Sequence, residues 1–147
     1  MHASKGMKNK EAARPSTVNE EPKEPCFVVG IGASAGGQDA LEQIFTALPS
    51  DCGLAFVVIM HLPPGGPSFL AEMLGRYTPM KVTTVEEGMA LHPDTVHVIP
   101  AGRQLTMSDG RFRLEAPADG RGAFHPVDCF FRSLASEARE EKKQSTG

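Results

Sequence analysis

The sequence contains no tryptophan and only three cysteines, Cys26, Cys52 and Cys129. The cysteines are widely spaced and odd in number, and no C-x-x-C pair occurs. This pattern excludes a disulfide framework and the ligand spacing of the common zinc sites. We therefore expect free thiols in a protein of the reducing cytoplasm. No motif calls for a metal or an organic cofactor, and none is expected.

An excess of positive charge is also missing. The chain has 15 basic and 18 acidic residues, with a net charge of −3. This balance argues against a nucleic-acid or anionic-lipid partner. The longest apolar run, residues 54–60, is far shorter than the roughly 20 residues that span a bilayer. Residues 1–25 lack the apolar core of a signal peptide. We expect a cytoplasmic protein without membrane insertion.

What is present fits a single domain, because 147 residues leave room for one domain and its flanking segments. Residues 1–25 are rich in charge, proline and serine, and this composition is typical of a disordered leader. Residues 140–147 are similarly polar and are expected to form a tail. The ordered domain is therefore placed at residues 26–139.

Hydrophobic periodicity within the domain predicts alternating strands and helices. The apolar runs 26–31 and 54–60 have the composition of buried parallel strands. The predicted elements between and after them are a helix that contains Ala40, Leu41, Ile44, Phe45 and Leu48, a short helix with Phe69, Leu70, Met73 and Leu74 on one face, strands within 80–91 and 95–102, a hairpin around Asp109–Gly110, and a last helix with Asp128 as its N-cap. This order predicts an α/β fold with a doubly wound, mostly parallel sheet and an inserted β-hairpin.

The stretch GIGASAGG, directly after the first predicted strand, fits two different motifs. Gly30, Gly32 and Ala35 match G-x-G-x-x-G/A, in which a dinucleotide pyrophosphate binds at a helix N-terminus. Ser34, between Gly32 and Gly36, matches G-x-S-x-G, a strand-to-helix turn that exposes a nucleophilic serine. The same sequence is also explained by a tight turn with a serine N-cap that has no catalytic or binding role.

The residue that ends the second predicted strand favours the serine motif. A dinucleotide site needs an acidic residue there for the ribose hydroxyl, and this chain has His61. If the two strands are neighbours, their carboxyl ends bring an imidazole beside the Ser34 hydroxyl, as a nucleophile and its general base require. The Ala35 backbone N–H, at the start of the following helix, is then a candidate donor to an oxyanion.

Several stretches together resemble the CheB-type protein-glutamate methylesterase domain. They are GIGASAGG, VVIMHLPPG, VHVIPAG and FHPVDCFFRSLA, in this order, over residues 26–139. They also resemble the form that is fused to a methyltransferase in CheB–CheR hybrid proteins. The resemblance implies hydrolysis of γ-glutamyl methyl esters on chemoreceptor cytoplasmic helices, with glutamine deamidation in some members. It places the nucleophile at Ser34, the general base at His61 and one oxyanion donor at the Ala35 amide.

One departure from the family pattern concerns the third member of its catalytic triad. That aspartate lies in a G-x-G-x-D-G segment at the end of a later strand, and this chain ends before such a segment. Asp128 is interpreted as a helix cap, Asp94 as a turn residue, and Glu86 and Glu87 as a solvated strand end. The sheet is therefore expected to be incomplete at its C-terminal side, and the esterase to be weak or inactive.

These observations leave three functions open: an esterase, a non-catalytic receptor-binding module and a nucleotide-binding half-domain. As an esterase, the chain acts on methylated receptor helices, with a CheR-type methyltransferase or a complementing C-terminal fragment as further partners. As a non-catalytic module or a remnant of a CheB–CheR fusion, it binds receptors without turnover. A nucleotide-binding half-domain is the third possibility, and His61 argues against it.

Overall fold

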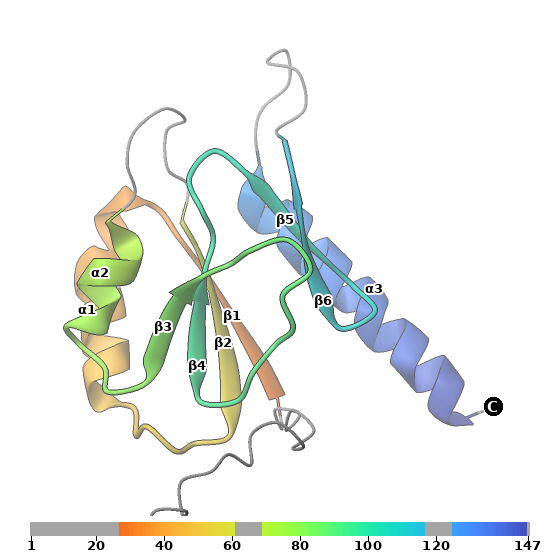
Figure 1. Cartoon of the computed structure of the whole chain (residues 1–147), viewed down its shortest axis with the longest axis horizontal. Helices are drawn as coiled ribbons and strands as arrows, with labels where there is room; N and C mark the ends of the chain where they lie inside the picture. Colours follow the sequence, from red (N-terminus) through yellow and green to blue (C-terminus); the bar gives the residue numbers. More distant parts are fainter. Residues whose placement is uncertain (1–26, 61–68, 117–124, 147) are drawn as a thin grey trace, which may run out of the picture.

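The computed structural model describes residues 27–60, 69–116 and 125–146. In chain order the elements are β1 (Phe27–Ala33), a 3-10 turn (Ala35–Gly37), α1 (Gln38–Ala47), β2 (Leu54–Met60), α2 (Leu70–Gly75), β3 (Lys81–Thr84), β4 (Thr95–Val98), β5 (Gln104–Ser108), β6 (Arg111–Glu115) and α3 (Pro126–Thr146) (Figure 1). The predicted leader, Cys26, His61 and the loop that follows it lie outside the described residues.

Four of the strands form one parallel sheet in the order β1-β2-β4-β3. The chain passes through α1 between β1 and β2, and through α2 between β2 and β3. Strands β5 and β6 form a separate antiparallel hairpin that follows β4. The prediction of an α/β fold with a mostly parallel sheet and an inserted hairpin is confirmed.

Both faces of the sheet are covered, as in a doubly wound fold. Helices α1 and α2 lie on one face, and the β5–β6 hairpin with α3 lies on the other (Figure 1). On β2, Phe56 and Val58 pack with the α1–α2 layer, whereas Val57 and Ile59 pack with the hairpin and α3. A strand with both sides covered needs apolar residues at every position, which explains the uninterrupted apolar run of β2.

The hairpin turn has the backbone conformation that its two central residues favour. Asp109 and Gly110 both have positive φ, at 53° and 74°. Two-residue turns with positive φ at both positions match the twist of the flanking strands, and Asp-Gly is a preferred pair there. The predicted hairpin is confirmed. The Glu137 carboxylate of α3 accepts hydrogen bonds from the backbone N–H groups of Asp109, at 3.1 Å, and Gly110, at 2.9 Å.

The last helix begins earlier than predicted. It begins at Pro126, so Asp128 lies inside its first turn and is not the N-cap. Proline is well suited to the first helical position, because its fixed φ fits the helix and its missing N–H has no helical partner there. The helix continues to Thr146, beyond the predicted domain boundary at residue 139.

Two apolar side chains predicted to face the core are exposed. Phe69 precedes α2 and is 63% exposed, and Ile44 on α1 is 41% exposed. Leu41 and Phe45 supply the buried face of α1. In the described part of the chain, no helix combines the length and the apolar composition needed to cross a membrane.

Candidate active site

Ser34 is the first residue after β1, at the carboxyl edge of the parallel sheet. Its backbone is extended, with φ −90° and ψ 174°, and its carbonyl oxygen accepts a hydrogen bond from the Gly37 N–H at 2.9 Å. This bond closes the 3-10 turn that leads into α1. The exposed Ser34 side chain occupies the cap position of the turn but makes no capping hydrogen bond. The geometry therefore does not support a purely capping role for Ser34.

The register of β1 and β2 aligns the residues that precede the two predicted catalytic positions. Ala33 pairs with Met60 at the carboxyl end of these neighbouring parallel strands. Ser34 follows Ala33 in the chain, and His61 follows Met60. Adjacent strands lie about 4.8 Å apart, so the two strands end side by side. The predicted adjacency of the strands is confirmed, whereas His61 lies outside the described residues and its role as a base stays a prediction.

Ala35 begins the 3-10 turn that follows Ser34. The first N–H groups of such a turn have no acceptor within the turn itself. The Ala35 N–H is thus in the right part of the chain for an oxyanion donor, and this role also stays a prediction.

The glycines of the motif serve helix packing rather than a pyrophosphate. A Cβ atom on Gly32 would lie 2.5 Å from Val127 Cγ1, and one on Gly30 would lie 2.6 Å from Phe131 Cε1. Both contacts are shorter than side chains tolerate, so the glycines allow α3 to lie directly against β1. A dinucleotide site requires the pyrophosphate to approach the backbone closely at the second glycine of the motif. The Val127 side chain occupies the space over Gly32, which argues against the dinucleotide interpretation. Around Gly36 no atom lies within 4 Å of such a Cβ.

The acidic residues considered as a third catalytic group have other positions. Asp94 precedes β4, at the amino edge of the sheet and opposite to Ser34. Its Oδ1 accepts a hydrogen bond from the Gly53 N–H at 2.7 Å, which agrees with its interpretation as a turn residue. Asp128 is exposed in the first turn of α3. Neither residue is brought into contact with Ser34 by an observed interaction.

Glu87 is exposed after β3, as predicted, and it also has two hydrogen-bond partners on β6. Its carboxylate accepts hydrogen bonds from the Leu114 N–H at 2.8 Å and from Arg113 Nη1 at 3.1 Å. The hydrogen bond from the Leu114 N–H, and to a smaller extent the one from Arg113, holds the pKa of the Glu87 carboxyl below its ordinary value. The residue is exposed, but it ties β6 to the segment that follows β3.

His97 was not singled out from the sequence, and it is fully buried in the middle of β4. Its Nδ1 lies 2.8 Å from the Phe56 carbonyl oxygen, and its Nε2 accepts a hydrogen bond from the His92 N–H at 3.3 Å. Both bonds are satisfied by a neutral ring with its proton on Nδ1. Burial lowers the pKa of His97. His97 pairs with Val57, three residues before the end of β2, and its buried ring has a structural role.

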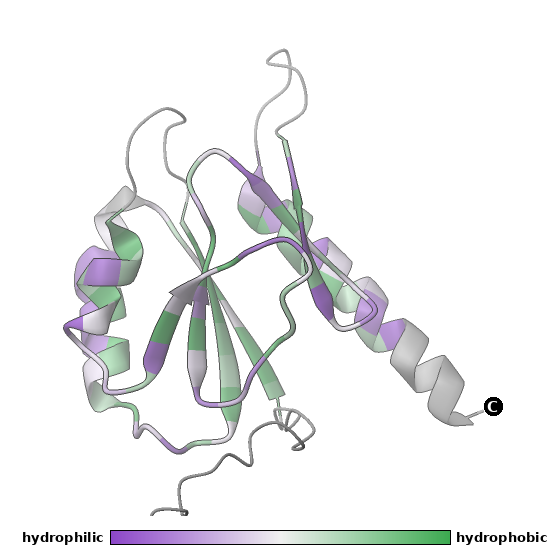
Figure 2. Ribbon diagram, in the orientation of Figure 1, coloured by the Kyte–Doolittle hydropathy of each residue, from purple (hydrophilic) through white to green (hydrophobic). Residues whose placement is uncertain are grey.

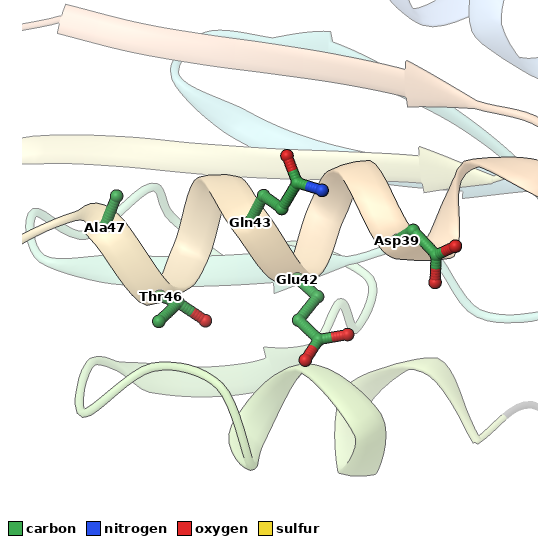
Figure 3. A pocket seen from close by; sticks show the side chains of 5 residues that line it. All are labelled: Asp39, Glu42, Gln43, Thr46 and Ala47. Atoms are coloured by element: carbon green, nitrogen blue, oxygen red, sulfur yellow. The ribbon is translucent and has the colours of Figure 1, made fainter.

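A shallow depression on the outward face of α1 is unrelated to the Ser34 region. It is lined by Asp39, Glu42, Gln43, Thr46 and Ala47, all exposed (Figure 3). The described residues contain no group of three or more histidine, cysteine or acidic side chains that could hold a metal ion.

Comparison with known proteins places these features in a family context. The family model described as CheB methylesterase matches residues 29–144. A protein-glutamate methylesterase/protein-glutamine glutaminase of Desulfitobacterium hafniense is 35% identical over 123 residues, which cover 79% of this chain and 31% of that protein. A protein of the same name from Geobacillus kaustophilus is 34% identical over 131 residues, covering 86% of this chain and 35% of the relative.

A solved structure gives the same result. The crystal structure of the Thermotoga maritima CheB methylesterase catalytic domain superposes with a TM-score of 0.63 at 30% identity. The match covers 74% of this chain and 60% of that domain. The chain spans about a third of the length of the two relatives above.

Proposed function

Because this chain belongs to the CheB methylesterase family, we propose that it carries the nucleophile and the general base of a serine esterase for γ-glutamyl methyl esters on proteins. The observation that carries the proposal is the pairing of Ala33 with Met60, because Ser34 follows Ala33 and His61 follows Met60 in the sequence. The exposed Ser34 side chain, without a capping bond, supports it further.

In the proposed reaction the Ser34 hydroxyl oxygen attacks the ester carbonyl carbon while His61 takes the hydroxyl proton. The Ala35 N–H stabilises the negative oxygen of the tetrahedral intermediate. Collapse of the intermediate expels methoxide, which receives the proton from His61 and leaves as methanol. Water, deprotonated by His61, then attacks the glutamyl–serine ester, releasing a glutamate carboxylate and restoring Ser34. With a glutamine substrate the same steps release ammonia, in keeping with the second activity in the relatives' names.

The proposed substrates are the methylated cytoplasmic helices of chemoreceptors, which makes the chain a cytoplasmic partner of a CheR-type methyltransferase. The family's triad aspartate has no counterpart in this chain, so we propose that these 147 residues alone turn over slowly. Binding of the receptor without turnover is the second candidate function. The favouring observation is that the chain matches only 60% of the solved catalytic domain.

An activity-based probe tests the proposal without requiring full turnover. Incubation with a fluorophosphonate should modify Ser34 faster than it modifies the denatured chain, because only the folded turn places a base beside the hydroxyl. The modification, read by peptide mass spectrometry, should vanish in Ser34→Ala. It should slow by about 10²-fold or more in His61→Ala. The matched control Ser50→Ala changes an exposed serine far along the chain and should leave the labelling unchanged.

Folded protein in which Ser34 is labelled no faster than in the denatured chain would contradict the esterase proposal. Labelling that is indifferent to His61→Ala would exclude this histidine as the base. Retained binding of a methylated receptor fragment in either case would favour the non-catalytic module.

A further inference from the structure

Phe69 stands at the start of α2, where neither burial nor helix capping accounts for a phenyl ring. Its side chain is 63% exposed and makes no capping hydrogen bond. Serine, threonine, asparagine and aspartate stabilise this position of a helix, because their side chains accept a backbone N–H. Phe69 contributes to α2 through its backbone instead, since its carbonyl oxygen accepts the Met73 N–H at 2.9 Å. The stability of the described fold therefore does not explain the ring.

The start of α2 lies beside the turn that contains Ser34. Helices α1 and α2 each return the chain from the carboxyl end of one parallel strand to the amino end of the next, so both begin at the carboxyl edge of the sheet. They lie next to each other on the same face (Figure 1, Figure 3). They share one buried cluster, to which they contribute Leu41, Phe45, Leu70 and Leu74. Ser34 and Phe69 thus belong to neighbouring helix starts at one edge of the molecule.

The other large apolar side chains that are exposed in the described residues lie elsewhere. Phe27 is the first residue of β1, at the amino edge of the sheet, and Ile44 lies in the second half of α1. Phe131 of α3 lies over Gly30, in the middle of β1. Of these four side chains, Phe69 is the one placed to contact a molecule that is bound at the start of α1.

The charges at this edge favour a protein segment over a lipid surface or a nucleic acid. Asp39 in the first turn of α1 and Glu72 in the first turn of α2 are both exposed, and Figure 3 shows Asp39 at the beginning of its helix. In Figure 2 hydrophilic residues are interspersed with apolar ones in the α1–α2 layer. Carboxylates repel the phosphates of anionic lipids and nucleic acids. A protein segment that carries an uncharged methyl ester meets no such repulsion.

We propose that Phe69 is a substrate-contact residue, whose ring packs on an apolar side chain of the protein segment that carries the methyl ester. This inference rests on the proposed function, in which the substrate is a protein. A helix is about 10–12 Å in diameter and packed helices lie about 8–10 Å apart, so a substrate helix bound at Ser34 also reaches the start of α2. Residues four positions apart share one face of a helix, so the ring selects substrates with an apolar residue one turn from the ester.

Binding of a synthetic peptide tests this inference. The probe is a fluorescent helical peptide with one glutamate γ-methyl ester and a leucine four residues to either side, and its Kd is measured by fluorescence anisotropy. We expect Phe69→Ala to raise the Kd by about tenfold or more, because leucine loses its apolar partner, and Phe69→Leu to retain most of the affinity. The matched control Phe27→Ala removes a similarly exposed ring from the amino edge and should leave the Kd unchanged.

A second peptide, with glutamine in place of both leucines, distinguishes a direct contact from a change in the fold. It should bind the unsubstituted chain about tenfold more weakly than the leucine peptide does. Phe69→Ala should have little further effect on it, because two substitutions at one contact are not additive. Circular dichroism checks that the variant is folded, and Phe69→Gln replaces it in the same cycle if it is not.

The outcomes separate this inference from the esterase proposal. A leucine peptide that does not bind, or that binds Phe69→Ala as tightly as the unsubstituted chain, would overturn the substrate contact whatever the reactivity of Ser34. Binding that depends on Phe69, together with Ser34 labelling no faster than in the denatured chain, would support the contact and contradict the esterase.

Discussion

At the scale of single residues, the buried His97 makes stability depend on pH. Its ring is neutral between the Phe56 carbonyl and the His92 N–H, and protonation of Nε2 would remove the acceptor for that N–H. Burial lowers its folded-state pKa from the ordinary value of 6.5. The unfolded chain therefore binds a proton at a higher pH than the folded chain. The contribution of His97 to stability is present above pH 6.5 and is lost as the pH falls toward the folded-state pKa.

We therefore predict that the free energy of unfolding, measured by urea denaturation, decreases below pH 6.5 by up to about 1.4 kcal/mol per pH unit on account of His97. His97→Gln, which removes the titration, should flatten this dependence. His92→Ala removes an exposed imidazole but keeps the backbone N–H, and should retain it. A steep acid dependence that survives in His97→Gln would show that other groups cause it.

At the scale of elements, the contact between α3 and β1 depends on two glycines. Gly32→Ala places a methyl group where Val127 already lies, at 2.5 Å, so the helix must move away from the strand. We predict a loss of about 1–3 kcal/mol in the free energy of unfolding, the usual cost of overpacking. Gly36→Ala is the control, since its methyl group enters open space. It should be neutral or stabilising by up to about 1 kcal/mol, because alanine restricts the unfolded chain.

A second contact between elements joins α3 to the β5–β6 hairpin. The Glu137 carboxylate accepts both N–H groups of the Asp109–Gly110 turn. Glu137→Ala should accelerate hydrogen exchange of these two amides by about tenfold, because they lose their acceptor. Ser136→Ala, at an exposed neighbouring position of the helix, should not change it. Unaltered exchange in Glu137→Ala would mean that the carboxylate does not hold the turn in solution.

At the scale of the whole molecule, the proposed activity can be compared with that of the solved catalytic domain, of which the chain matches 60%. The family's triad acid orients the imidazole, and its absence from a serine hydrolase lowers turnover by about 10⁴-fold. We predict a deficit of that order in methyl-ester hydrolysis by these 147 residues, relative to the Thermotoga maritima catalytic domain. Release of methanol from a methylated receptor fragment is the measurement, with Ser34→Ala as the background. Equal rates for the two proteins would show that another group in this chain serves as the acid.

Much of this architecture could be predicted because it depends on local sequence. The bounds of β2, Leu54–Met60, coincide with the apolar run, and the hairpin turn forms at Asp109–Gly110. The start of α3 at Pro126 was missed because aspartate and proline both mark helix beginnings, and their order along the chain did not decide between them. Phe69 was assigned to a buried face because helical spacing shows a stripe of apolar residues but not where that stripe ends.

The sequence by itself determined the class of fold, the serine turn at Ser34 and the position of His61 after a buried strand, because periodicity, turn residues and motifs act over a few neighbouring residues. The tertiary structure decided which strands are neighbours, that Gly30 and Gly32 make room for α3, and that the apolar β1 lies at an edge of the sheet formed by the described residues. The apolar sequence of a strand predicts that both of its faces are covered. The sequence of the strand does not identify the segments that cover it, because these depend on contacts between residues far apart in the chain.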